Sequence, residues 1–176
     1  EAGSDGIYGF VNAQRPTSGD IGVSIGSIIN AVGGSIVVDS DAFDFGNDSA
    51  DRSLVTIGSI SNAGTVDAGD NAFELDDVVV GSISNTGSIV AADEGLRISG
   101  SRIQSIANSG SISASDNAIE VRNSSTNSSE VGSIFNSGSL IGNNESGISI
   151  QGSSSVQGIF NTGSIVADNA GIDVGG

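Results

Sequence analysis

Short pairs of apolar residues recur along the chain at fixed distances from one repeated asparagine. The repeated phrase reads Val-Gly-Ser-Ile-Ser-Asn-Thr-Gly-Ser-Ile at Val80 to Ile89 and returns with small changes elsewhere. The asparagines that mark it are Asn12, Asn30, Asn62, Asn85, Asn108, Asn136 and Asn161. Their intervals run from 18 to 32 residues, which is typical of repeat architectures.

Each repeat carries three apolar elements separated by polar residues. The first places apolar side chains five and two residues before the asparagine: Ile25/Ile28, Ile57/Ile60, Val80/Ile83, Ile103/Ile106, Val131/Ile134 and Val156/Ile159, with Ile7/Phe10 in the same frame before Asn12. The second lies four residues after it: Val66, Ile89, Ile112, Leu140 and Ile165, with Ile36 displaced by two residues. The third is an alternating pair: Phe43/Phe45, Phe73/Leu75, Leu96/Ile98, Ile119/Val121, Ile148/Ile150 and Ile172/Val174. Alternation with period two indicates a strand with one buried face.

Three short strands per repeat predict an all-β fold, a single-chain parallel β-helix (β-solenoid). Poor helix formers dominate the repeat, namely Gly, Ser, Asn and β-branched residues, so helical repeats are excluded. We expect about seven coils of three short strands and no capping helix. The chain is expected to form one domain over residues 1–176, with an irregular first coil at 1–24 and regular coils at 25–176.

The repeated asparagine is predicted to form a ladder, because equivalent residues of a solenoid stack from coil to coil about 4.8 Å apart. Each amide can then hydrogen-bond to the copies above and below it. The Asn-x-Gly step is expected to turn the corner, since both residues tolerate a positive φ. Two longer segments, Gly46–Thr56 and Arg122–Glu130, fall at one corner of the coil. They are interpreted either as solvated loops or as a binding edge.

Charge and composition restrict the partners. The formal net charge is −16, with five Arg and no Lys, which argues against nucleic acid and against anionic membrane surfaces. There is no Cys and therefore no disulfide framework. No apolar run approaches the roughly 20 residues of a membrane helix, so no membrane insertion is expected.

The acidic and polar residues give no convincing catalytic or metal-binding pattern. The cluster Asp39, Asp41, Asp44, Asp48 and Asp51 lacks the spacing of known calcium loops and is interpreted as a solvated face. On the third strands, Arg97 is predicted to lie between Glu74 and Glu120 of the adjacent coils and to relieve their charge repulsion.

Catalysis is not expected from this composition. Serine is abundant, but there is no His and no Gly-x-Ser-x-Gly elbow. We therefore predict no enzyme activity, no catalytic or cofactor-binding residues, no cofactor and no metal. A polysaccharide-active β-helix is kept as a less favoured alternative.

The phrase Ile-x-Asn-x-Gly-Ser-Ile, followed by Gly-Ile-x-Val at Gly147–Ile150 and Gly171–Val174, resembles the β-helical passenger repeats of bacterial autotransporters and related large surface adhesins. The resemblance covers residues 21–176. It implies a secreted protein, extracellular or on the cell surface, that serves as an adhesin stalk, an enzyme scaffold or a fibre.

Two functional hypotheses follow from the strand order. The chain is predicted to start at a first strand, Ile7/Phe10, and to end after a third strand, Ile172/Val174. The two ends of different copies would then be in phase. The first hypothesis is therefore a non-enzymatic structural rod that stacks head-to-tail with itself, through open solenoid ends, into a surface or biofilm-matrix fibre. The alternative is the stalk of an autotransporter-like adhesin that contacts glycans or cell surfaces.

Overall fold

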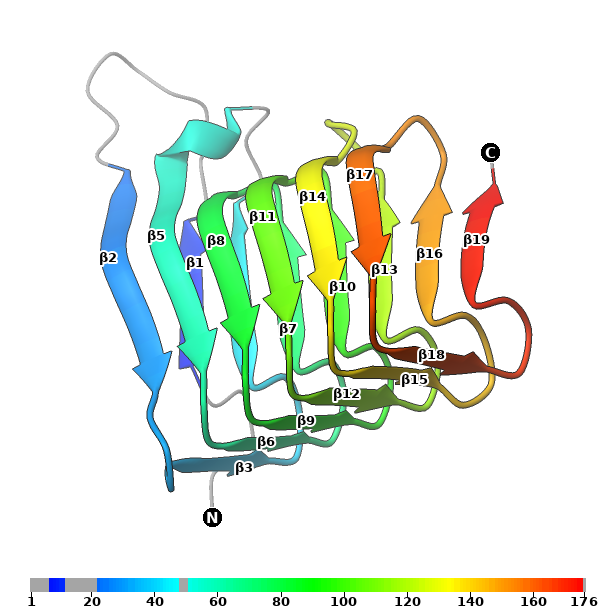
Figure 1. Ribbon diagram of the computed structural model, residues 1–176. Helices are drawn as coiled ribbons and strands as arrows, with labels where there is room; N and C mark the ends of the chain where they lie inside the picture. Colours follow the sequence, from blue (N-terminus) through cyan, green and yellow to red (C-terminus); the bar gives the residue numbers. More distant parts are fainter. Residues whose placement is uncertain (1–6, 12–21, 48–50, 176) are drawn as a thin grey trace.

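The computed structural model describes residues 7–11, 22–47 and 51–175. These residues wind into a parallel β-solenoid, which confirms the predicted fold class (Figure 1). A single 3₁₀ turn, η1 (Arg52–Leu54), interrupts the strands, and the described residues contain no α-helix. None of their helical segments is long and apolar enough to cross a membrane.

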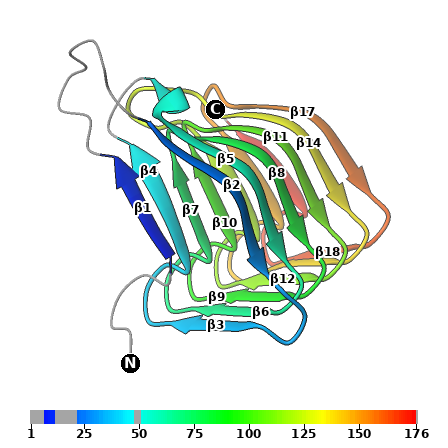
Figure 2. The same ribbon diagram turned by 90° about the vertical axis from the view of Figure 1, so that its left-hand side faces the viewer.

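Three parallel sheets form the three sides of the coil, as seen along the axis in Figure 2. Sheet 1 contains β2 (Val23–Asn30), β5 (Val55–Asn62), β8 (Val79–Asn85), β11 (Arg102–Asn108), β14 (Glu130–Asn136) and β17 (Ser155–Asn161). Sheet 2 contains β3 (Ser35–Val38), β6 (Thr65–Ala68), β9 (Ser88–Ala91), β12 (Ser111–Ala114), β15 (Ser139–Gly142) and β18 (Ser164–Ala167). Sheet 3 contains β1 (Ile7–Val11), β4 (Phe43–Asn47), β7 (Phe73–Asp76), β10 (Leu96–Ser99), β13 (Ile119–Arg122), β16 (Ile148–Gln151) and β19 (Ile172–Gly175).

The number of coils and the position of the first strand differ from the prediction. Among the described residues, sheets 1 and 2 have six strands each and sheet 3 has seven. They form six complete coils joined by five coil-to-coil steps rather than about seven coils. The strand at Ile7–Val11 was expected in sheet 1, but it pairs with β4 in sheet 3. Asn12 and residues 13–20 of the expected irregular coil lie outside the described residues. The regular coils begin at β2, close to the predicted residue 25.

Side chains of the predicted apolar positions fill the interior of the coil. Ile60, Ile83, Ile106 and Ile134 stack in register along sheet 1, and all four are buried. In sheet 3 the rings of Phe43 and Phe73 stack with their centroids 4.6 Å apart. The axial repetition of one residue type lets the coils pack closely, because identical shapes meet at each step.

The corner between sheets 1 and 2 combines the predicted asparagine ladder with a column of glycines. Five hydrogen bonds of 2.7 to 2.8 Å join the ladder, each from the Nδ2 of one asparagine to the Oδ1 of the next, in the order Asn30, Asn62, Asn85, Asn108, Asn136 and Asn161. The ladder is confirmed, but the conformational reason given for the glycines is wrong. Among the described residues, the glycines with positive φ are Gly33, Gly100 and Gly152, and none belongs to an Asn-x-Gly step of the ladder.

Candidate functional site

The outer face of sheet 3 carries most of the ionisable side chains that interact across coils. In register, Arg97 of β10 lies beside Glu74 of β7 and Glu120 of β13. Arg97 Nη1 is 2.7 Å from both carboxylate oxygens of Glu74, and its Nε is 3.9 Å from Glu120 Oε2. This confirms the predicted charge ladder.

This face is hollowed into an acidic groove of about 740 Å³. Its acidic lining residues are Asp41, Asp44, Asp70, Glu74, Asp76 and Asp77. Arg97 and Arg122 also line it, and residues 123–126 form one wall. The groove is strongly anionic, so it fits cations or neutral polar ligands better than anionic ones.

The wall at residues 123–126 belongs to the second of the two long segments, and Asp77 anchors it. Ser124 Oγ and Asn127 Nδ2 each donate to Asp77 Oδ1 at 2.8 Å, and Thr126 Oγ1 donates to Oδ2 at 2.9 Å. Asp77 lies two coils earlier and adopts a φ of 53°. The segment is therefore held against the coil by three partly buried hydrogen bonds, which fix it as a wall of the groove.

Burial perturbs the carboxyl groups beside Arg97. Burial, and then the neighbouring Asp76 carboxylate, raise the pKa of Glu74 to about 8 although Arg97 opposes the shift. Burial also raises the pKa of Glu120, again against Arg97. A carboxyl group with a pKa near neutrality has the protonation equilibrium of a general acid or base.

Both carboxylate oxygens of Glu74 are nevertheless already engaged in hydrogen bonds with neighbouring side chains. Both of its oxygens accept from Arg97 Nη1, and Oε2 also accepts from Asn71 Nδ2 at 2.8 Å. No aromatic side chain lines the described part of the groove. The exposed aromatic pair, Phe135 and Phe160, stacks on sheet 1 instead, with centroids 4.9 Å apart. The side chains around Arg97 thus form a network of ion pairs and hydrogen bonds along the groove.

The acidic cluster singled out from the sequence does not converge into a metal-binding group among the described residues. Asp41 and Asp44 line the groove, and Asp51 caps η1 by accepting from Ser53 N at 3.0 Å. Asp48 lies outside the described residues, and no three described members of the cluster bring carboxylate oxygens together.

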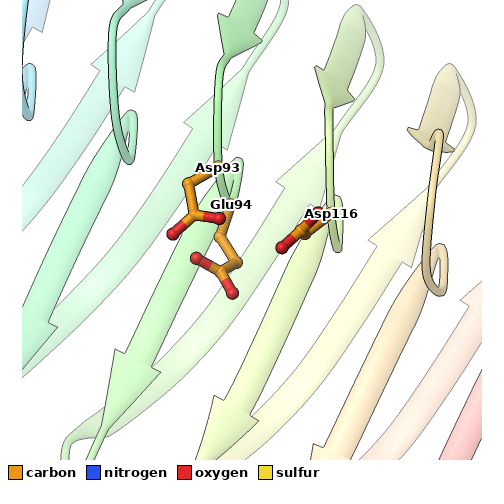
Figure 3. Close-up of side chains that lie close together, drawn as sticks. All are labelled: Asp93, Glu94 and Asp116. Atoms are coloured by element: carbon orange, nitrogen blue, oxygen red, sulfur yellow. The ribbon is translucent and has the colours of Figure 1, made fainter.

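A different acidic group converges, at the corner between sheets 2 and 3. Carboxylate oxygens of Asp93, Glu94 and Asp116 all lie within 4.8 Å of one another (Figure 3). The sequence analysis missed this group. Its signal was the 23-residue interval between Asp93 and Asp116, which equals the interval between Asn85 and Asn108.

Comparisons with family models, with curated proteins and with solved structures found no match to this chain. The site is therefore interpreted from its own geometry.

The raised pKa of Glu74 predicts a thermal stability that decreases with pH. Glu74 titrates near 4.5 when unfolded and near 8 when folded, so its protonated form contributes stability that is complete below about pH 4.5 and lost by about pH 8. We expect the melting temperature to fall by roughly 5 °C between pH ~5 and ~8.5. Differential scanning calorimetry of the wild type and Glu74→Gln measures this.

The Gln variant should show a smaller fall than the wild type, because one titrating group is gone. Asp67→Asn, which removes an exposed carboxylate on β6, is the matched control and should keep the wild-type slope. Identical slopes in all three proteins would contradict the assignment of this pH dependence to Glu74.

Proposed function

We propose that this chain is a non-enzymatic, extracellular structural rod whose solenoid is extended by a further β-coil at its C-terminal end. The observation that supports this is the exposure of core-position side chains in the last coil. Val174 stacks on Ile150 in sheet 3, yet Val174 is 73% exposed whereas Ile150 is 8% exposed. Ile172, which stacks on the buried Ile148, is 45% exposed.

Covering these side chains would be favourable on two counts. Burial of apolar surface contributes roughly 25 cal/mol per Å². The last strands β17, β18 and β19 are also the edges of their sheets, and edge strands present unpaired backbone groups to any partner strand. A coil of the same register satisfies both requirements, which is how repeat arrays extend.

Two sources of that coil correspond to the two hypotheses. A second copy could place its β1 on β19, since both strands belong to sheet 3. Among the described strands, that contact would leave a one-strand gap in sheets 1 and 2, because β2 and β3 are their first strands. Residues 12–21, which join β1 to β2, lie outside the described residues, so the in-phase joint between copies stays a prediction. The head-to-tail fibre is the first form of this proposal, and the stalk of an autotransporter-like adhesin is the alternative.

The negative charge of the chain supports a rod that does not associate side by side with other rods. The net charge of −16 gives the flanks a repulsion that opposes lateral association. For the adhesin form of this proposal, the exposed Phe135 and Phe160 on sheet 1 offer apolar contact to glycans or cell surfaces.

The exposed coil end predicts concentration-dependent, end-to-end association of the isolated chain. Val174→Asp places a charge on that end and should abolish the association, as measured by sedimentation velocity and negative-stain electron microscopy. Val166→Asp is the matched control, because Val166 is 54% exposed on the outer side of the same coil. It should associate as the wild type does.

The form of the assemblies separates the two hypotheses. Short end-to-end oligomers support a segment that needs a further coil. Long filaments with an axial repeat of about 34 Å, set by the seven strands of sheet 3 at ~4.8 Å each, would favour the fibre. A chain that stays monomeric at all concentrations, with no difference between the variants, would contradict an association surface at this end.

A further inference from the structure

The corner between sheets 2 and 3 stacks acidic residues from successive coils. Asp93 follows β9 and Asp116 follows β12, one coil later. The backbone fixes their alignment, since Asp93 N donates to Asp70 O at 3.3 Å and Asp116 N donates to Asp93 O at 3.1 Å. Three aspartates thus occupy one column at coil spacing. Like charges directly opposite each other destabilise a ladder, so this column needs compensation.

Glu94 occupies the adjacent column, in which the equivalent residues of the neighbouring coils are asparagines with a different hydrogen-bonding pattern. Its neighbours are Asn71 and Asn117. The Oδ1 atom of Asn71 accepts from Glu94 N at 3.2 Å, and its Nδ2 donates to Glu74. Likewise Asn117 Oδ1 accepts from Ser146 N at 3.1 Å, and its Nδ2 donates to Glu145 at 2.7 Å. An amide serves both roles, whereas a carboxylate can only accept.

Glu94 leaves a polar atom without a partner inside this corner. The residue is only 9% exposed, and its Oε2 atom is buried without any hydrogen bond. The side chain extends toward Asp93 and Asp116 (Figure 3). A buried carboxylate oxygen without a partner is costly, and here it adjoins two further carboxylates.

The nearby cations are engaged elsewhere. Arg97 Nη1 is held by both oxygens of Glu74 at 2.7 Å, and Arg122 Nε lies 3.5 Å from Glu120 Oε2. These two guanidinium groups therefore pair with Glu74 and Glu120 rather than with the carboxyl groups at the corner.

We propose that Asp93, Glu94 and Asp116 bind a divalent cation, with Ca²⁺ preferred, and that the ion ties the third and fourth coils together. Ca²⁺ takes oxygen ligands at about 2.3–2.6 Å, so two of its ligands lie at most about 5 Å apart. The oxygens of this group lie within 4.8 Å of one another, which fits one coordination sphere. Water would supply the remaining ligands. The inference differs from the expectation of no metal drawn from the sequence.

Calcium is favoured over magnesium because of how the ligands are held. The two aspartates stand on backbone positions fixed by the ladder, so their separation is set by the coil spacing. Mg²⁺ demands near-ideal octahedral geometry at about 2.0–2.1 Å, whereas Ca²⁺ accepts irregular arrangements. With three carboxylates and water, affinity should fall in the range of extracellular calcium modules, about 10⁻⁴–10⁻³ M.

The test is a calcium titration of the 176-residue chain at near-neutral pH after treatment with a chelator. Isothermal titration calorimetry should show saturable binding of one Ca²⁺, and about 5 mM CaCl₂ should raise the melting temperature by about 3 °C or more. Magnesium at the same concentration should give a smaller shift. In Glu94→Gln, affinity for Ca²⁺ should fall at least about tenfold, and the thermal shift should be lost.

Two further variants make the result specific. Asp116→Asn removes the ligand from the next coil and should weaken binding as Glu94→Gln does. Asp67→Asn removes the same charge from the outer face of β6 and should bind Ca²⁺ as the wild type does. No saturable binding by the wild type would overturn the proposal, and so would equal binding by the wild type and Glu94→Gln. These outcomes leave the rod proposal intact, because that proposal is tested by Val174→Asp in the last coil, two coils away from the site.

Discussion

Gly110→Ala is expected to be among the most destabilising of all conservative substitutions in this chain. A Cβ atom at residue 110 would lie 2.0 Å from the carbonyl oxygen of Gly87 and 2.7 Å from the carbonyl carbon of Thr86. Both are backbone atoms of the preceding coil. That backbone cannot move aside, because Gly87 O accepts from Ser111 N at 2.9 Å within the sheet-to-sheet corner.

The equivalent glycines of the other coils lie equally close to the backbone of the coil that precedes them. Gly64, Gly87, Gly138 and Gly163 form the rest of the column, and each added Cβ would meet the preceding coil at 2.0 to 2.2 Å. Relief would require the coil spacing to open locally, which would break ladder hydrogen bonds and open voids in a close-packed core. We expect a loss of about 4 kcal/mol or more in the free energy of unfolding, measured by urea denaturation followed by circular dichroism.

Gly26→Ala is the matched control for this substitution. It lies in β2, at the edge of sheet 1, and an added Cβ there meets nothing within 4 Å. Its free energy of unfolding should stay within about 0.5 kcal/mol of the wild type. If Gly110→Ala unfolded at the same urea concentration as Gly26→Ala, the steric account of the glycine column would be wrong.

The glycine column also shows where the sequence analysis predicted a feature for the wrong reason. The Asn-x-Gly step was expected to need a positive φ, since that is the usual property of glycine at a turn. The structure requires instead the absence of a side chain between two coils. A repeated Gly in one sequence is compatible with either reason, and the distinction depends on the distance between coils.

The fold itself could be predicted because the apolar positions are unambiguous. Alternating pairs such as Ile119/Val121 and the constant offset of Ile106 from Asn108 determine which side chains point inward. The sheet assignment predicted for the strand at Ile7–Val11 was wrong. Its apolar spacing fits the frame before Asn12, but the strand pairs with β4. A strand at the edge of a sheet has only one neighbouring strand, so its apolar spacing can be compared with only one other coil.

The candidate metal site could not be predicted with the same ease. The sequence drew attention to Asp39–Asp51, where acidic residues are close along the chain. In a solenoid, however, the residues that meet are one coil apart, as Asp93 and Asp116 are. The contact between Asp77 and Asn127 spans two coils, so even coil-period reasoning misses it. The buried, unpartnered Oε2 of Glu94 is a property of packing that no spacing rule contains.

Asn85→Ala should have the second large effect, because one side chain serves several buried groups. The Nδ2 of Asn85 donates to Asn108 Oδ1 at 2.8 Å and to Ser111 O at 3.0 Å, and its Oδ1 accepts from Asn62 Nδ2 at 2.8 Å. The residue is 2% exposed, so water cannot replace these bonds without opening the corner. Each buried polar group left unsatisfied costs about 1–3 kcal/mol.

We therefore expect Asn85→Ala to lower the free energy of unfolding by about 3 kcal/mol, measured by urea denaturation. Asn161→Ala is the matched control, since Asn161 occupies the same column in the last coil but is exposed. It accepts from Asn136 Nδ2 at 2.7 Å and otherwise donates only to Gly163 O, at 3.3 Å, within its own coil. Its loss should be under about 1 kcal/mol, because water reaches the groups that it leaves. Equal losses of unfolding free energy at the two positions would contradict this account. They would show that each asparagine stabilises only its own coil, and that hydrogen bonds between the stacked amides add nothing.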